Sequence, residues 1–408
     1  MLRIGYVIGT RPEVIKCAPP ILAMEKDARF EPFLVSTGQH AEMFHSALDI
    51  FGIAPAADLK VMRPQQTLSG ITERILSGLS ELPLMRDLDA IIVHGDTAST
   101  VAGAIFGFQN KIPVIHLEAG LRSTRLDSPF PEEGNRRLVA QVSSYHLAPT
   151  TGNYLNLLRE GIAHDRIAIT GNTVVDALLW SVPKARDYRD PVLDEIDRDP
   201  RRIVLASTHR RESWPKLPLL AEALAEVARL PNVRVVIPVH RNPVVREALL
   251  PRLEGHPNIT LLEPLPYLGF VRLMSRADLI LSDSSGAEEE GPAMGKPTLI
   301  LREVTERREA IEVGSAKLVG RTKEEIVEAV RAVLSDEALY KQFVSGGCPY
   351  GDGAASPRVL DAIAHFFRGE EPAAESYISR NRDIARNLSL GRPAGNTVNR
   401  HEYVEETT

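Results

Sequence analysis

The chain has 408 residues and a formal net charge of -6 at pH 7, with 43% hydrophobic and 25% charged residues. This composition is typical of a globular protein, and it excludes the strongly basic field that nucleic acids or anionic membranes would require. The length exceeds what a single hydrophobic core usually supports, so we expect two domains.

Short apolar, β-branched runs alternate with longer helical segments along the chain. Buried parallel strands separated by helices produce this pattern. The first predicted set of strands is Ile4–Ile8, Phe33–Ser36, Ala90–His94, Val114–Glu118 and His146–Ala148. The second set is Ile203–Ser207, Arg234–Val239, Ile259–Leu262, Leu279–Ser282, Thr298–Leu301 and Lys317–Val319. Helices are predicted at Leu68–Leu82 and Leu217–Leu230, where apolar residues recur at helical spacing.

The two sets predict an α/β protein with two doubly wound domains. Prolines and a charged run interrupt the pattern between Thr173 and Pro200, which places the domain break there. We assign residues 1–175 to an N-terminal domain and 176–367 to a C-terminal domain. Residues 368–408 are polar, and we expect a tail that is partly packed or disordered. Ligands of such sheets bind beyond the carboxyl ends of the strands, so we expect the site in the cleft between the domains.

The cysteine content and the length of the apolar runs exclude several further classes of protein. Cys17 and Cys348 are the only cysteines, too few for a disulfide framework or a four-ligand zinc site. No apolar run approaches the roughly 20 residues of a membrane helix, and the first residues do not resemble a signal peptide. We therefore predict a cytoplasmic protein with no nucleic-acid or membrane partner.

Two polar motifs follow predicted strands of the N-terminal half. Gly9-Thr10-Arg11-Pro12-Glu13 opens a helix, where free N–H groups together with Arg11 and Lys16 could hold a phosphate. An ordinary strand-to-helix turn with solvated charges is the alternative. Asp96 follows the third strand, and it could act as a base, bind a substrate hydroxyl or simply cap the next helix.

The richest motif lies between residues 116 and 137. Glu118 ends a predicted strand, so it should share a face with His116, and Pro129-Phe130-Pro131-Glu132-Glu133 follows in a loop. Carboxylates at Glu118, Glu132 and Glu133 beside two arginines suit proton transfer next to an anionic leaving group. A solvated loop with paired charges is the alternative, although two close prolines favour a rigid loop.

The C-terminal half has its own polar strand ends. His209 follows one strand within Thr208-His209-Arg210-Arg211, and a second histidine, His240, is as readily structural as functional. Ser284, Ser285 and Gly286 precede an acidic helix start and could present N–H groups to a diphosphate. Glu290 lies one turn further on and could reach a ribose, while Arg307 follows the next strand and adds a cation.

Several familiar cofactor and catalytic motifs are missing. No Gly-x-Gly-x-x-Gly follows a strand, so nicotinamide or flavin binding of the usual kind is unsupported. The segment Gly291–Pro297 has the wrong spacing for a P-loop, and a proline stands where Ser or Thr is required. There is also no His-Glu-x-x-His metal motif and no Gly-x-Ser-x-Gly nucleophile elbow.

Taken together, these motifs resemble those of the non-hydrolysing UDP-N-acetylglucosamine 2-epimerases. The matching segments, in order over roughly residues 1–365, are GTRPEVIK (9–16), TGQHAEM (37–43), HGDTAST (94–100), HLEAGLRS (116–123), SPFPEEGNRR (128–137), THRRES (208–213), PVHRNP (238–243), DSSGAEEEGPAMGKP (283–297) and TERREA (305–310). The resemblance implies two Rossmann-like domains in a glycosyltransferase-B arrangement, an interdomain active site and a homodimer. It implies interconversion of UDP-N-acetylglucosamine and UDP-N-acetylmannosamine by anti elimination of UDP through 2-acetamidoglucal, with no cofactor and no metal.

The resemblance also implies roles for individual residues. Asp96, Glu118 and Glu132 become the acid/base candidates of the N-terminal domain, and His209 that of the C-terminal domain. The implied ligands of the sugar or diphosphate on the N-terminal side are Arg11, Lys16 and Arg136. Those of UDP on the other side are Ser284, Ser285, Gly286, Glu290 and Arg307, with Phe270 near the uracil.

Some positions depart from the family pattern. Ser285 stands where Gly is usual and Glu288 where Gln is usual, while Gly134 replaces Ala and Arg308 replaces Pro. The changes at Ser285 and Glu288 bear on which UDP-sugar is used, so an epimerase acting on another UDP-sugar is the closest alternative. A glycosyltransferase of the same architecture and a non-catalytic sugar-nucleotide binder are the others.

Overall fold

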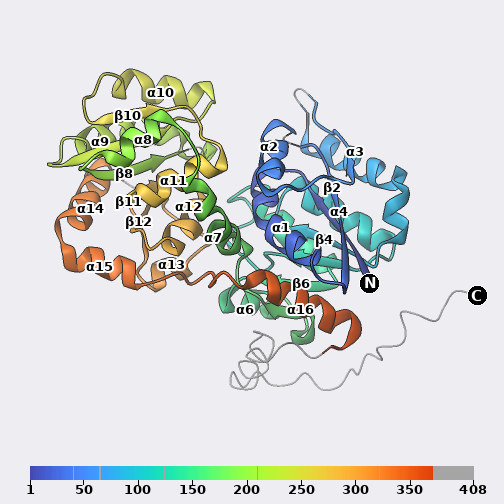
Figure 1. Ribbon diagram of the computed structural model, residues 1–408. Coiled ribbons are helices and arrows are strands. Elements are labelled where there is room, and N and C mark those ends of the chain that lie inside the picture. The colour runs from blue at the N-terminus through green and yellow to red at the C-terminus, as the bar shows by residue number, and fades with distance from the viewer. Residues whose placement is uncertain (40, 64–65, 124, 209, 321, 371–408) are drawn as a thin grey trace, which may run out of the picture.

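Two parallel β-sheets, each covered by helices, form the two halves of the computed structural model (Figure 1). The structure describes residues 1–39, 41–63, 66–123, 125–208, 210–320 and 322–370. The expected α/β class with two doubly wound domains is therefore confirmed. His209 and most of the predicted tail, residues 371–408, lie outside the described residues.

The first sheet has seven strands in the order β3-β2-β1-β4-β5-β6-β7, all of them parallel. Their bounds are β1 Leu2–Ile8, β2 Phe30–Ser36, β3 Ala57–Asp58, β4 Ala90–His94, β5 Val114–Leu117, β6 Tyr145–Ala148 and β7 Ile167–Ile169. Every residue of β4 is buried, as expected for a strand with helices on both faces. The strand order reverses between β1 and β4, which is where such sheets bind ligands.

The second sheet repeats this design with six parallel strands in the order β10-β9-β8-β11-β12-β13. Their bounds are β8 Arg202–Ser207, β9 Val233–Pro238, β10 Ile259–Leu262, β11 Leu279–Ser282, β12 Thr298–Ile300 and β13 Ala316–Leu318. Here the order reverses between β8 and β11. Both reversal points therefore place polar strand ends at the expected type of ligand site.

The helices cover both faces of each sheet (Figure 1). Those of the first half are α1 Arg11–Met24, α2 Ala41–Phe51, α3 Leu68–Glu81, α4 Ala98–Gln109, α5 Glu132–Val142, α6 Thr151–Arg159 and α7 Thr173–Arg186. Those of the second half are α8 Pro191–Arg198, α9 Leu217–Val227, α10 Pro243–Leu253, α11 Tyr267–Arg276, α12 Ser285–Ala293, α13 Glu309–Glu312, α14 Lys323–Ser335 and α15 Glu337–Ser345. The last helix is α16 Ala355–Arg368. Short 3-10 segments occur at Pro83–Asp87, His164–Arg166 and Arg211–Lys216.

Every predicted strand is present, with ends shifted by a few residues, and both predicted helices are confirmed as α3 and α9. Two short strands, β3 and β7, were not predicted. One predicted end is wrong in a way that matters: β5 stops at Leu117, and Glu118 has a φ of +62°. The shared face expected for His116 and Glu118 therefore does not exist, because Glu118 has left the extended conformation.

Two stretches of chain link the halves, and they touch each other. The first is α7, which contacts α1 on one side and α11 and α12 on the other. The second leads from α15 back to α16. The Asp176 carboxylate of α7 accepts hydrogen bonds from the N–H groups of Ala355 and Ser356 at 3.1 and 2.7 Å, and Asn172 N–H donates to the Tyr350 carbonyl at 2.7 Å.

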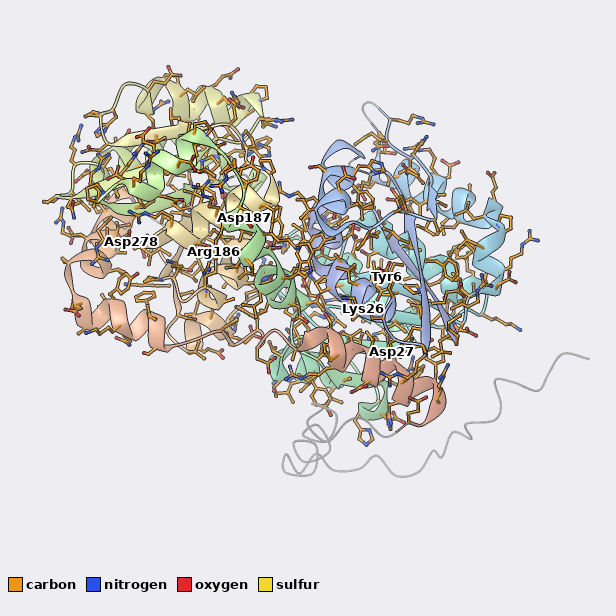
Figure 2. All side chains as sticks on the ribbon, in the orientation of Figure 1. Tyr6, Lys26, Asp27, Arg186, Asp187 and Asp278 are labelled. Atoms are coloured by element: carbon orange, nitrogen blue, oxygen red, sulfur yellow. The ribbon has the colours of Figure 1, made fainter. Side chains whose placement is uncertain are left out.

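The last helix packs on the first half of the molecule (Figure 1), although the predicted boundaries place residues 176–367 in the second domain. Phe366 stacks on Tyr145 with ring centroids 4.5 Å apart. Arg29, which is ion-paired with Asp27 (labelled in Figure 2), also reaches Asp361 of α16 at 3.2 Å. The predicted boundary after residue 175 also falls inside α7.

The largest apolar cluster continues from one half into the other. It includes Tyr6 of β1, fully buried and labelled in Figure 2, and extends through α7 to Tyr267 of α11. Phe51 of α2 stacks on Trp180 of α7 with ring centroids 4.6 Å apart. This shared core fixes the orientation in which the carboxyl ends of the two sheets face each other.

Candidate active site

The loops after β1 and β4 are joined by the carboxylate of Glu13. Its Oε2 accepts hydrogen bonds from the N–H groups of Gly9 and Thr10 at 2.8 and 2.7 Å, and Oε1 accepts from the Thr97 hydroxyl at 2.7 Å. Glu13 is 1% exposed. The sequence offered a signal for this role, since Thr10-x-x-Glu13 has the spacing of a capping box.

Gly9 is required by the crowding in this loop. A Cβ at Gly9 would lie 1.9 Å from Thr37 Oγ1 and 2.6 Å from Ser99 Oγ, and these two hydroxyls are hydrogen-bonded to each other at 2.8 Å. The close approach lets the loop after β1 pass beside the start of α4. Arg11 and Lys16 then leave α1 toward the second half of the molecule.

Lys16 occupies the centre of the junction between the halves. Its Nζ forms ion pairs with Glu118 and, at 2.8 Å, with Glu289 of α12, and its side chain is 8% exposed. Burial alone would lower the pKa of Lys16, but the two carboxylates outweigh burial and raise it. Lys16 is therefore a permanent cation at the point where α1 meets α12.

Glu118 is held by groups from both halves. Beyond Lys16, it accepts a hydrogen bond from Asn172 at 3.0 Å, and it lies 3.5 Å from Arg307 and 3.6 Å from His94. Burial raises the pKa of Glu118, but Lys16, His94 and Arg307 together bring it well below its usual value. A glutamate with a φ of +62° is unfavourable by itself, and such conformations cluster at functional sites.

Asp96 lies beside the Glu118 cluster, at the end of β4. Its carboxylate pairs with Arg136 of α5 at 2.7 Å, and its carbonyl accepts a hydrogen bond from the Asn135 side chain at 2.7 Å. Its side chain keeps 25% exposure, unlike that of Arg136 at 5%. Asp96 therefore combines a fixed orientation with access to solvent.

Glu132 and Glu133 start α5 but have different environments. Glu133 is fully buried and binds Arg136 and Arg137, together with the N–H of Ser123. Glu132 has a buried Oε2 with no hydrogen-bond partner among the described residues. Burial, helped by the nearby Asp96, raises the pKa of Glu132. Glu133 is thus a structural anchor, while Glu132 keeps an unused acceptor.

Arg307 is the cation that the second half contributes to the cluster around Lys16 and Glu118. It pairs with Glu289 at 2.7 Å and with Glu306 at 2.6 Å, in addition to its approach to Glu118. Glu306 in turn contacts Arg302 at 3.0 Å and lies 3.8 Å from Arg136 of the first half. Burial raises the pKa of Glu306, but the surrounding arginines together bring it well below its usual value.

The start of α12 lies at the reversal point of the second sheet. Ser284, Ser285 and Gly286 are partly exposed there. Asp283 anchors the turn, because its buried carboxylate accepts from the Thr208 hydroxyl at 2.7 Å and from the Arg210 N–H at 3.2 Å. The loops after β8 and β11 are therefore tied together, as Glu13 ties those after β1 and β4.

Glu290 faces the first half from α12. Its Oε1 accepts a hydrogen bond from the Tyr267 hydroxyl at 3.0 Å, and burial raises the pKa of Glu290 to about 7. Burial also lowers the pKa of Arg11, against the attraction of the Glu290 carboxylate, which raises it. Phe270 lies one turn after Tyr267 on α11 and packs against the shared core.

The structure thus brings Lys16, Glu118 and Arg307 into one ion-paired cluster and places Asp96, Glu132 and Arg136 beside it. It places Arg11 opposite Glu290 and sets Ser284–Gly286 at the start of α12. Sequence reasoning assigned no role to Glu13, His94, Asn172, Tyr267, Glu289 or Glu306. Of these, Glu13, His94, Glu289 and Glu306 lay within the motifs quoted above, whereas Asn172 and Tyr267 lay outside them.

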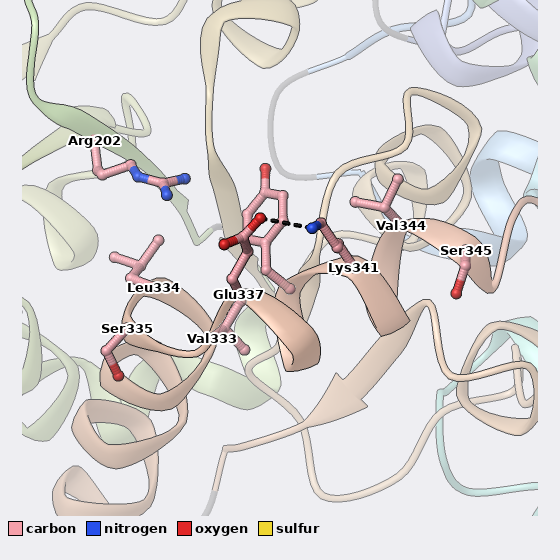
Figure 3. A pocket seen from close by; sticks show the side chains of 9 residues that line it. Arg202, Val333, Leu334, Ser335, Glu337, Lys341, Val344 and Ser345 are labelled. Atoms are coloured by element: carbon pink, nitrogen blue, oxygen red, sulfur yellow. Dashed lines mark ion pairs between the residues drawn. The ribbon is translucent and has the colours of Figure 1, made fainter.

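Two pockets elsewhere share no residue with this cluster. One, of about 790 Å³, lies between α14 and α15 and is lined by Arg202 and Tyr340 (Figure 3). The ion pair across its wall, Lys341 with Glu337 at 2.6 Å, is largely exposed. Among the described helices, none has both the length and the apolar composition of a membrane span.

Comparison with known proteins identifies the family. A family model described as UDP-N-acetylglucosamine 2-epimerase matches residues 22–364. The UDP-N-acetylglucosamine 2-epimerase of Yersinia pestis is 45% identical over 372 residues, covering 89% of this chain and 98% of the relative.

Solved structures agree with the sequence comparisons. The UDP-GlcNAc 2-epimerase of Neisseria meningitidis bound to UDP-GlcNAc superposes with a TM-score of 0.83 at 39% identity, covering 89% of this chain and 99% of that one. The Methanocaldococcus jannaschii UDP-GlcNAc 2-epimerase in complex with UDP-GlcNAc and UDP has a TM-score of 0.78 at 32% identity, covering 89% and 100%. With most of both chains matched in sequence and fold, this chain belongs to the UDP-N-acetylglucosamine 2-epimerase family.

Proposed function

We propose that the protein interconverts UDP-N-acetylglucosamine and UDP-N-acetylmannosamine. The observation that carries the proposal is Glu118, a buried carboxylate held between Lys16 of the first half and Arg307 of the second. A proton-transfer group and cations for a departing diphosphate thus meet at the junction of two Rossmann-like sheets. Relatives that cover nearly the whole chain are named for this activity, and one is described bound to UDP-GlcNAc.

The proposed reaction proceeds by anti elimination and re-addition. A carboxylate removes the proton from C2, the C1–O bond to the diphosphate breaks, and its electron pair leaves with UDP. A C1–C2 double bond forms, giving 2-acetamidoglucal. A proton is then delivered to the opposite face of C2, and the UDP oxygen re-forms its bond at C1.

Carboxylates in different electrostatic environments suit this scheme. Lys16, His94 and Arg307 lower the pKa of Glu118 despite its burial, whereas burial raises the pKa of Glu132. Asp96, 25% exposed and oriented by Arg136, is the third candidate. His209 stays a proposed participant from the second half on the strength of its motif.

The diphosphate is proposed to bind between α1 and α12. Arg11, Lys16 and Arg136 supply cations from the first half. Ser284, Ser285 and Gly286 present helix N–H groups from the second, with Arg307 beside them. Glu290 and Phe270 are assigned to the ribose and the uracil. In the relatives, UDP-GlcNAc and UDP are the bound molecules.

Glu288 stands where the family usually has Gln, and its contacts within the second half favour UDP-N-acetylglucosamine as the substrate. Its Oε2 accepts a hydrogen bond from the Thr305 hydroxyl at 2.5 Å, and its Oε1 lies 3.3 Å from Arg302. Glu288 is fully buried, and Arg302 balances its negative charge. The extra carboxylate is thus engaged with the loop after β12 rather than with a ligand. We also propose that the protein is a homodimer located in the cytoplasm.

The test is incubation of the protein with UDP-N-acetylglucosamine in deuterium oxide, followed by proton NMR. We expect UDP-N-acetylmannosamine with deuterium at C2. Release of free N-acetylmannosamine and UDP would identify a hydrolysing enzyme. No change in protein that still binds UDP would contradict the proposed substrate, and the same assay with other UDP-sugars would follow.

A further inference from the structure

The buried histidine His116 contacts the turn that carries Asp96. Its Nε2 lies 2.8 Å from the carbonyl oxygen of Gly95, and the side chain is 0% exposed. A carbonyl oxygen only accepts hydrogen bonds, so Nε2 must carry the proton. Burial lowers the pKa of His116 to about 4, which keeps the ring neutral at physiological pH. His116 is therefore a fixed neutral donor beneath the end of β4.

The Gly95–Asp96 turn is held from several sides. Gly95 has a φ of +68°, and its N–H donates to the Leu117 carbonyl at 3.0 Å. Asn135 donates to the Asp96 carbonyl at 2.7 Å, and Arg136 to its carboxylate at 2.8 Å. These contacts hold Asp96, while His116 binds the carbonyl of Gly95.

We propose that His116 is a positioning residue that acts through Asp96, by fixing the peptide between Gly95 and Asp96. The proposal rests on the acid/base role assigned to Asp96 above. Without the donor, the Gly95 carbonyl would be buried and unpaired, which is costly enough to shift the turn. A displacement of about 1 Å at a reacting group lowers turnover by roughly 10²-fold.

The chain offers a matched control in His146 of β6. His146 pairs with His116 in the register of β5 and β6, and it is also 0% exposed. The two ring centroids lie 6.5 Å apart. Neither ring nitrogen of His146 has a hydrogen-bond partner among the described residues. Substitution of His146 therefore disturbs the same core without touching the Gly95 carbonyl.

The experiment compares three variants of the full chain. The amide of glutamine reaches about as far as the histidine Nε2, whereas that of asparagine ends near Nδ1. His116→Asn should lower kcat by about 10²-fold with KM within about threefold. His116→Gln should restore kcat to within about tenfold of the wild type, and His146→Asn should stay within about threefold. Equal losses in His116→Asn and His146→Asn, or in His116→Asn and His116→Gln, would overturn the proposal.

A second readout separates this proposal from the proposed function. Backbone hydrogen exchange of the segment 93–98, followed by mass spectrometry, needs no turnover. We expect faster exchange there in His116→Asn than in the wild type or His146→Asn. Equal exchange in all three would reject the positioning role. If exchange is faster in His116→Asn but the wild type has no epimerase activity, His116 still holds the Gly95–Asp96 turn. The proposed function, and with it the acid/base role of Asp96, would then be refuted.

Discussion

Lys16 and Glu118 lie 102 residues apart in the chain and form an ion pair in which both side chains are less than one-tenth exposed. The pair is shared, because Lys16 also binds Glu289 and Glu118 also approaches Arg307. Each charge is therefore balanced by groups from both halves of the molecule. Removing one partner would leave a buried charge without compensation.

Lys16→Met should destabilise the protein by about 3–5 kcal/mol, because Glu118 and Glu289 would lose their shared cation inside the protein. The double variant Lys16→Met with Glu118→Gln should recover part of this loss, since one of the two stranded charges is then neutral. The measurement is the free energy of unfolding from urea titration of the wild type, both single variants and the double variant. Strict additivity of the two changes would refute a direct interaction.

Glu118→Gln and Asp96→Asn should each lower kcat by about 10²–10⁴-fold, the range expected for loss of a general acid or base. Binding of UDP, measured by calorimetry, should change only a few-fold. Glu31→Gln is the matched control, because Glu31 forms a surface ion pair with Arg3 far from the junction. Full activity in either site variant would remove that residue from proton transfer.

The raised pKa of Glu290 predicts that the free energy of unfolding depends on pH. Its pKa is about 7 in the folded protein, raised by burial, against about 4.5 when unfolded. Between these values the folded state keeps a proton that the unfolded state releases. Stability contributed by Glu290 is therefore complete below pH 4.5 and is lost as the pH rises through 7. The wild type minus Glu290→Gln difference in unfolding free energy, measured from pH 5 to 8, should fall with rising pH; a flat difference would contradict the raised pKa.

Two glycine-to-alanine changes should have opposite effects. Gly9→Ala should destabilise the protein and impair activity, because the new methyl group would collide with Thr37 Oγ1 and Ser99 Oγ. Gly134 lies inside α5, where an added methyl group would meet nothing within 4 Å, so Gly134→Ala should stabilise by about 0.5–1 kcal/mol. Thermal unfolding of both variants checks this, and a shift of the same sign in both would refute the steric explanation.

The fold was largely predictable from local patterns. Buried parallel strands are short apolar runs, so β4 and β11 are visible in the sequence as such. The strands β3 and β7 were missed because two or three residues carry no periodicity. The sequence also did not predict that α16 packs on the first half, because an amphipathic pattern does not indicate which sheet a helix packs against.

The site was predictable only where residues belong to motifs at strand ends. The motif around residue 118 indicated a reactive carboxylate, but the turn at Glu118 depends on partners such as Lys16 and Asn172 that come from distant segments. Glu289 shows the same difficulty, because three consecutive glutamates on α12 look alike in sequence. Their separate partners, Thr305, Lys16 and Tyr267, come from three different segments, and only Lys16 belongs to the other half of the molecule.

The contact between the two linking segments has a consequence for motion. Asp176 holds the start of α16, and Asn172 holds Tyr350, so the outward and returning chains are fastened side by side. The two linking segments therefore form one joint between the halves rather than two separate ones. Any rotation of one half against the other would bend both segments at this same place. A cut within residues 346–354, between α15 and α16, would break one of the two covalent links without cutting a strand of either sheet.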